Sequence, residues 1–166
     1  MSARFGRLPW LWLSLLVFVI DQASKFYFDN ALTLYQQIVV IPDYFSWTLA
    51  YNTGAAFSFL AGESGWQRWL FALIAIVISA VLVVWLKRLK PDETWLAMAL
   101  ALVLGGALGN LVDRVVFGHV VDFVLVHWQH RWYFPAFNVA DAAITLGAIL
   151  LALDMFKSHK SGETNP

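Results

Sequence analysis

The chain has 166 residues, of which 60% are hydrophobic and 13% are charged, and its formal net charge is zero. Soluble domains contain roughly 45–50% apolar and about 25% charged residues, so this composition predicts a membrane protein. The neutral balance gives no reason to expect a nucleic-acid partner, and the absence of cysteine excludes disulfides, a thiol nucleophile and thiolate metal ligands.

Four apolar stretches are long enough to cross a bilayer of about 30 Å as helices. They cover residues 8–28, 69–86, 95–111 and 137–156. The first stretch contains Asp21 and Lys25 and has no small-x-small cleavage site before them, so we interpret it as an uncleaved anchor. The four spans predict an all-α membrane protein that forms one domain over 1–166. We expect the polar tail, 157–166, to be disordered.

Basic residues indicate the direction in which the chain crosses the membrane. They cluster before the first span, between the second and third spans, and after the fourth span: Arg4, Arg7, Lys87, Arg88, Lys90, Lys157 and Lys160. Because cytoplasmic loops carry the excess of lysine and arginine, both termini are expected in the cytoplasm. The loops 29–68 and 112–136 then face outward.

The first outward loop contains residues that favour strands. Residues 38–41 and 45–51 are rich in β-branched and aromatic side chains, and a Pro42-Asp43 turn signal separates them. A small extracytoplasmic β-sheet is therefore expected. The segment 54–69 is amphipathic and predicts a short helix that lies in the membrane interface.

Two aspartates stand in apolar surroundings where a carboxylate is costly. Asp122 lies between valine and phenylalanine residues in the second outward loop, and Asp141 lies one turn into the fourth span. An acid at the centre of a membrane helix costs roughly 2.5–3.5 kcal/mol on insertion scales. Because the chain reverses direction between the third and fourth spans, both acids can meet at the outer boundary of the bilayer. Two carboxyls that share one proton can activate water and protonate a peptide carbonyl, as in aspartic proteases, without a metal or a cofactor.

Each aspartate also has a purely structural interpretation. Asn138 followed by Asp141 is typical of a helix N-cap with an acid that complements the helix dipole. Asp122 taken alone fits a solvated loop acid equally well. For the whole chain, a proton-coupled carrier and a non-enzymatic scaffold are the alternatives. A carrier predicts acids near the midplane and an inverted repeat, and no repeat is visible.

Other polar residues gather near the same ends of the spans. Asn110 and Arg114 share a face at the outer end of the third span, and Asp113 is close enough to Asn110 for a hydrogen bond. Asp21 and Lys25 are four residues apart and predict an ion pair. Lys25 can also extend toward the outer headgroups.

Two further features have ordinary explanations when each is taken alone. Asn52-Thr-Gly54 leaves the expected sheet through small residues and is typical of a simple turn. His127 and His130 are three residues apart, but no third ligand is evident, so no metal site is expected.

Several segments together resemble the signal peptidase II family, the bacterial inner-membrane aspartic proteases of lipoprotein maturation. They are Asp21-Gln-x-x-Lys25, Tyr51-Asn52-Thr-Gly54-Ala-Ala-Phe57-Ser58, Gly106-Ala-Leu-Gly-Asn110-Leu-Val-Asp113-Arg114, Gly118-His-Val-Val-Asp122-Phe123 and Phe137-Asn138-Val-Ala-Asp141. The resemblance covers nearly the whole chain, and the combination is far more specific than any single segment.

The resemblance implies an endopeptidase that removes the signal peptide from diacylglyceryl-modified prolipoproteins by cutting before the lipidated cysteine. It implies that Asp122 and Asp141 are the catalytic pair. It also implies supporting or substrate-binding roles for Asn52, Gly54, Asn110, Arg114, Asn138, Asp21, Lys25 and Asp113. The implied fold has four transmembrane helices, an extracytoplasmic β-sheet and a helix beside the active site. A monomer in the bacterial inner membrane is expected, with its active site toward the periplasm, prolipoproteins and membrane lipids as partners, and no cofactor.

Overall fold

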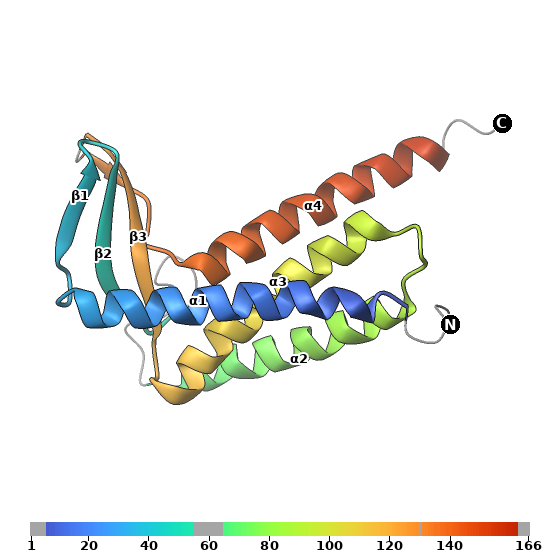
Figure 1. Ribbon diagram of the computed structural model, residues 1–166, viewed down its shortest axis with the longest axis horizontal. Helices are drawn as coiled ribbons and strands as arrows, with labels where there is room; N and C mark the ends of the chain where they lie inside the picture. Colours follow the sequence, from blue (N-terminus) through green and yellow to red (C-terminus); the bar gives the residue numbers. More distant parts are fainter. Residues whose placement is uncertain (1–5, 55–64, 130, 163–166) are drawn as a thin grey trace.

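The computed structural model describes residues 6–54, 65–129 and 131–162. Its helices are α1 (Leu11–Ala31), preceded by the short 3₁₀-helix η2 (Leu8–Trp10), then α2 (Trp66–Arg88), α3 (Thr94–Val116) and α4 (Val139–Gly162). Its strands are β1 (Gln37–Ile41), β2 (Phe45–Asn52), β3 (Val120–Trp128) and β4 (Trp132–Tyr133). The sheet stands at one end of the helix bundle, while α1 begins and α4 ends at the other end (Figure 1).

The four helices are each long and apolar enough to cross a membrane, as the sequence predicts. The spans are Leu8–Ala31, Trp66–Arg88, Thr94–Val116 and Val139–Phe156. One boundary needs correction, because α4 continues to Gly162 through the first part of the tail that was expected to be disordered. No proline or glycine occurs between positions 157 and 161, so the backbone can remain helical until Gly162.

Helix α3 lies at the centre of the bundle, where it packs against α1, α2 and α4. Glycines allow this close approach: a Cβ atom on Gly105 would lie 2.7 Å from the backbone oxygen of Ser14 in α1. A Cβ atom on Gly106 would meet the backbone of Ala140 in α4. Since either contact is too short for a side chain, substitution at these positions would push the neighbouring helix away from α3.

The sheet is antiparallel throughout, in the order β1-β2-β3-β4. The β1–β2 hairpin is the one expected from the sequence, with its turn at Pro42-Asp43. The prediction that Asp122 lies in a loop is wrong, because residues 120–128 form β3 and pair with β2. Valine and aromatic residues dominate this segment and favour a strand, so its pattern was available in the sequence.

Aromatic packing joins the sheet to the end of α1. The ring of Phe28 stacks on Phe123 of β3, with centroids 4.4 Å apart, and contacts Trp47 of β2 at 4.8 Å. This contact fixes β3 beside the helix bundle and so determines the position of Asp122. The expected interfacial helix at 54–69 falls mostly on residues 55–64, outside the described residues, and Trp66 begins α2.

Candidate active site

Asp122 lies on β3 with its carboxyl group removed from solvent. Its partner in the antiparallel register is Ala50 of β2. One carboxyl oxygen accepts a hydrogen bond from Asn138 Nδ2 at 2.7 Å, and the other accepts one from Asn52 Nδ2 at 3.3 Å. Since Asp122 is only 2% exposed, these amide donors take the place of water.

Asp141 lies in the first turn of α4, close to the residue that caps this helix. The backbone N–H of Asp141 donates to Asn138 Oδ1 at 2.9 Å, and the backbone N–H of Asn138 donates to Asp141 Oδ2 at 3.4 Å. This reciprocal arrangement is a capping box, so the structural interpretation of Asn138 and Asp141 is confirmed. The carboxylate also accepts a hydrogen bond from Asn110 Nδ2 of α3 at 2.7 Å, which capping does not require.

Asn138 links the two aspartates. Its Nδ2 donates to Asp122, while its Oδ1 and backbone N–H contact Asp141. Asn110 closes the group, because its Nδ2 donates to Asp141 and its Oδ1 accepts from Asn138 Nδ2 at 3.3 Å. An acid on a strand and an acid on a helix are thus held together by neutral amides, which orient the carboxyl groups without neutralising them.

Burial raises the pKa of Asp122 to about 7, and the negative charge of Asp141 acts in the same direction. The hydrogen bonds from Asn52 and Asn138 lower this pKa but do not offset the burial. A carboxyl group with a pKa near 7 is about half protonated at neutral pH, so the pair can hold one proton. In that state one carboxyl can accept a proton while the other donates one.

A buried ionic group lies beside the aspartates. Lys25 Nζ of α1 is 2.8 Å from Asp21 Oδ2 and 3.0 Å from Asp113 Oδ2, and it donates to Asn110 Oδ1 at 2.9 Å. The expected ion pair between Asp21 and Lys25 is therefore confirmed. Lys25 is 3% exposed, however, and does not extend toward the headgroups. Asp113 pairs with Lys25 rather than with Asn110, because the amide of Asn110 is directed at Asp141.

This ionic group holds the backbone segments that carry the two aspartates. Asp21 Oδ1 accepts the backbone N–H of Ala140 at 2.8 Å, next to Asp141. Asp113 Oδ2 accepts the backbone N–H of Val121 at 3.2 Å, next to Asp122. Gln22 Nε2 donates to Asp113 Oδ1 at 2.9 Å. Gln22 was not predicted as a site residue, and its only indication in the sequence is its place in the Asp21-Gln-x-x-Lys25 segment.

Arg114 joins the turn after β2 to the helices. Its guanidinium donates to the backbone oxygen of Gly54 at 3.1 Å and to its own helix four residues earlier at 3.1 Å. It also lies over the ring of Phe71 in α2, 5.5 Å from the ring centroid. Its positive charge interacts with Asp141 and, more weakly, with Asp122. Arg114 is thus the cation that faces the pair from the side of α2.

Residues 13–157 match the family model described as signal peptidase (SPase) II. The chain belongs to this family. The lipoprotein signal peptidase of Pseudomonas syringae pv. tomato (strain ATCC BAA-871 / DC3000) is 80% identical over 163 residues, which cover 98% of this chain and 94% of that protein. The lipoprotein signal peptidase of Pseudomonas aeruginosa (strain UCBPP-PA14) is 80% identical over 160 residues, covering 96% and 95%.

The same fold occurs in a solved structure described as a bacterial membrane enzyme studied by the in meso method at 2.3 Å resolution. It superposes with a TM-score of 0.84 at 28% sequence identity and covers 100% of this chain and 98% of that one. The signal peptidase II family consists of peptidases of lipoprotein maturation, and the four spans make this member a multi-pass bacterial membrane protein. The carrier and scaffold alternatives are therefore excluded.

A cavity of about 720 Å³ lies between α2, α3 and α4 of the peptidase. Its polar wall is formed by Asn52, Asn110, Arg114 and Asp141. Most of the remaining wall is apolar and includes Phe71, Ile74, Ile78, Val103, Ile144 and Ile149. Asp122 does not line this cavity. It lies behind the amides that bind it, so only one acid of the pair is open to the cavity in this structure.

All the site residues selected from the sequence fall into one continuous set of hydrogen bonds and ion pairs. From Asp122 the contacts pass through Asn52 and Gly54 to Arg114, and from there to Asn110. Asn110 in turn contacts the remaining members: Asp141, Asn138 and Lys25, the last of which pairs with Asp21 and Asp113.

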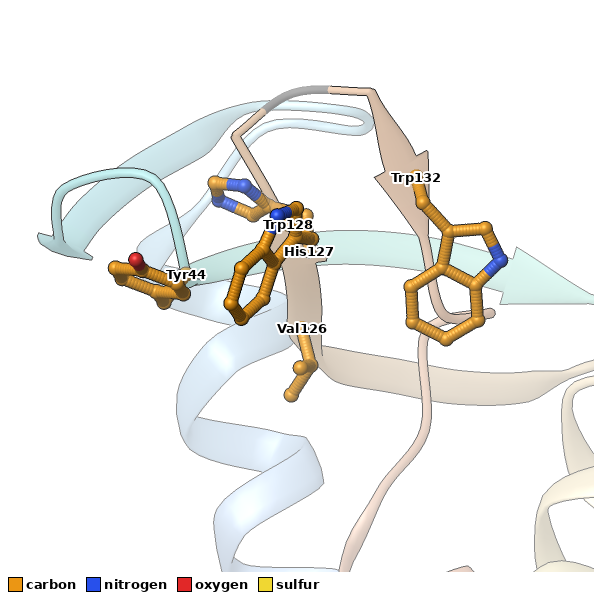
Figure 2. A pocket seen from close by; sticks show the side chains of 5 residues that line it. All are labelled: Tyr44, Val126, His127, Trp128 and Trp132. Carbon is orange, nitrogen blue, oxygen red and sulfur yellow. The ribbon is translucent and has the colours of Figure 1, made fainter.

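His127, which was considered as a metal ligand from the sequence, packs in the sheet. His127 is 2% exposed, and its Nε2 lies 3.3 Å from Ser46 Oγ. It forms part of an aromatic pocket of about 380 Å³ with Tyr44, Val126, Trp128 and Trp132 (Figure 2). His130 lies outside the described residues, and the described ranges contain no group of three His, Asp or Glu side chains suited to a metal ion.

Proposed function

We propose that Asp122 and Asp141 are the catalytic pair and that they hydrolyse the peptide bond before a diacylglyceryl-modified cysteine in a prolipoprotein. The observation that supports this most strongly is the link through Asn138, which holds both carboxyl groups in one hydrogen-bonded set. A pKa of about 7 for Asp122 provides the shared proton that such a reaction needs.

The reaction uses the ionised and the protonated carboxyl in turn. The ionised carboxylate removes a proton from water, and the water oxygen attacks the carbonyl carbon of the scissile bond. The protonated carboxyl donates its proton to the carbonyl oxygen, giving a neutral gem-diol. When this intermediate collapses, one hydroxyl returns its proton to the carboxylate, and the other carboxyl gives the proton that it took from water to the leaving nitrogen of the cysteine as the C–N bond breaks. The pair again holds one proton at the end.

The surrounding residues act by orientation and charge. Asn52 and Asn138 direct the Asp122 carboxyl, and Asn110 directs that of Asp141. Lys25 and its two acidic partners fix the backbone next to each aspartate, as described above. Because these contacts set positions rather than react, their loss is expected to lower the rate through geometry.

The cavity supplies the binding surface for the substrate. A prolipoprotein precursor has an apolar signal helix on one side of the scissile bond and lipid chains on the other. The apolar walls of α2, α3 and α4 match both, while the polar wall stands next to Asp141. Apolar contact thus provides affinity, and the carboxyl pair provides the chemistry.

The sheet end of the bundle is proposed to face the periplasm. The backbone N–H of Arg7 donates to the backbone oxygen of Leu86 at 2.8 Å, so Arg7 lies beside the end of α2, which carries Lys87 and Arg88. The end of α2 and the turn before α3 lie at the end of the bundle away from the sheet (Figure 1). The positive-inside rule favours a cytoplasmic position for that end, and this supports a carboxyl pair near the periplasmic boundary.

The rate of cleavage is expected to fall as the pH rises through about 7. A carboxyl whose pKa is raised holds its proton below that pKa and loses it above, and the pair needs one proton to act. The measurement is the pH dependence of kcat/KM for purified enzyme with a lipidated precursor between pH 5 and 9. A rate that stays constant to pH 9 would argue against a shared proton.

Asn138→Ala is expected to reduce kcat by roughly 10²-fold through misplaced carboxyl groups and to move the alkaline limb of the pH profile to higher pH. The hydrogen bond from Asn138 lowers the pKa of Asp122, so its removal raises that pKa further. A helix-capping role alone would weaken folding without moving the pH profile. Asn30→Ala, the same substitution at an exposed asparagine near the end of α1, is the comparison variant, and it should leave the profile in place.

Chelating agents are expected to leave the rate unchanged, because both proton transfers are assigned to carboxyl groups. The test is cleavage by enzyme incubated with EDTA or 1,10-phenanthroline, followed by removal of the chelator. Inhibition that added zinc reverses would contradict the proposed chemistry.

A further inference from the structure

A second large cavity lies at the end of the bundle away from the sheet and the aspartates. It has a volume of about 690 Å³, and its lining includes Val81, Val84, Trp85, Arg88, Lys90 and Glu93. It shares no lining residue with the cavity beside Asp141. We refer to it as the α2 groove, since most of its wall comes from the last two turns of α2.

The wall of the α2 groove is an outward-facing apolar stripe. Val81, Val84 and Trp85 share one helix face, and they are 56%, 47% and 43% exposed. Leu82 and Leu86 face the opposite way and are buried in the core with α3. The stripe belongs to a membrane span, so its natural surroundings are lipid chains.

The apolar stripe ends at two cations. Arg88 closes α2 on the same face as Val81 and Val84, and Lys90 follows in the turn before α3. Among the described residues neither Arg88 nor Lys90 has an ion-pair partner. Glu93 is the acid among the lining residues, and its carboxylate accepts the backbone N–H of Lys90. The Glu93 carboxylate is therefore directed at the backbone. Arg88 and Lys90 together leave the rim of the groove with a net positive charge.

This combination matches an amphiphile with apolar chains and a negatively charged head. From Val81 to Arg88 the helix rises roughly 10 Å, enough for part of an acyl chain alongside α2. Guanidinium and ammonium groups at the membrane boundary bind phosphate, and a headgroup that carries its own ammonium would be repelled by them. We infer that the α2 groove binds one anionic phospholipid, with an acyl chain along Val81, Val84 and Trp85 and its phosphate against Arg88 and Lys90.

The inference is tested by native mass spectrometry of the full-length enzyme in neutral detergent. Phosphatidylglycerol and phosphatidylethanolamine with identical acyl chains are supplied in equal amounts. The wild type is expected to retain one bound phosphatidylglycerol at least about fivefold more often than phosphatidylethanolamine. The double variant Arg88→Gln/Lys90→Gln should lose this preference, with an expected weakening of about tenfold or more. Lys87→Gln is the matched control, because Lys87 is an exposed neighbouring cation outside the groove.

Several outcomes would overturn the inference. An equal loss in Lys87→Gln would mean that general basic charge, not the groove, selects the lipid. Displacement of the bound lipid by inorganic phosphate alone would mean that the apolar stripe plays no part. A dimer that separates in Arg88→Gln/Lys90→Gln would assign the groove to a second copy of the chain. Cleavage of a lipidated precursor by the double variant at the wild-type rate in detergent shows that it is folded, and this control does not depend on the assignment of the aspartates.

Discussion

Asp122→Asn and Asp141→Asn are each expected to reduce cleavage of a diacylglyceryl-modified precursor by roughly 10³-fold or more. An amide has nearly the shape of a carboxyl group, but it can neither take a proton from water nor pass one to the carbonyl oxygen. Burial disfavours the charged form of Asp122, so its replacement by a neutral amide should leave the protein folded. The measurement is the initial rate with purified variants in detergent, together with their unfolding midpoints.

Asp92→Asn is the matched control for this pair. Asp92 is an exposed acid in the turn before α3, at the far end of the bundle, so the same chemical change there should leave the rate intact. The double variant Asp122→Asn/Asp141→Asn should be no slower than the slower single variant, because the two groups act as one unit. Wild-type cleavage by either single variant would refute the catalytic assignment.

Lys25→Met is expected to destabilise the protein by about 3–5 kcal/mol, since it leaves two buried carboxylates without their counter-charge. Asp21 and Asp113 are both essentially unexposed, and Lys25 Nζ lies within 3.0 Å of each. The same change should lower cleavage, because these acids hold the backbone at Ala140 and Val121 beside the proposed catalytic pair. Thermal unfolding in detergent and initial rates measure the two effects.

The control for Lys25→Met is Lys87→Met, which makes the same substitution at an exposed lysine near the end of α2. Its unfolding midpoint should stay close to that of the wild type. If Lys25→Met unfolds at the wild-type temperature, the buried ion pairs do not hold the site as described.

The parts of the fold that were predictable depend on local patterns. Charge-free apolar runs of about twenty residues identify α2 and α3, and the Pro42-Asp43 turn between two β-branched segments identifies the β1–β2 hairpin. The ion pair of Asp21 with Lys25 follows from their spacing on one helix. Each of these features needs only neighbours in the sequence.

The parts that were missed depend on contacts between distant segments. The residues around Asp122 favour a strand locally, but the pairing with β2 that positions its carboxyl group joins segments far apart in the sequence. Asn138 has a clear local role as a cap, and nothing in its sequence neighbourhood indicates that its side chain also reaches Asp122. The preference of Asp113 for Lys25 likewise requires α1 to lie against α3, which the glycines of α3 permit.

The most direct test is an experimental structure of the enzyme with a peptide mimic that carries a hydroxyl group in place of the scissile carbonyl. The hydroxyl should lie within hydrogen-bond distance of the carboxyl groups of both Asp122 and Asp141, with the apolar part of the mimic between α2, α3 and α4. A mimic that inhibits the enzyme but contacts only one of these carboxyls, or neither, would show that the two aspartates do not act together on one peptide bond.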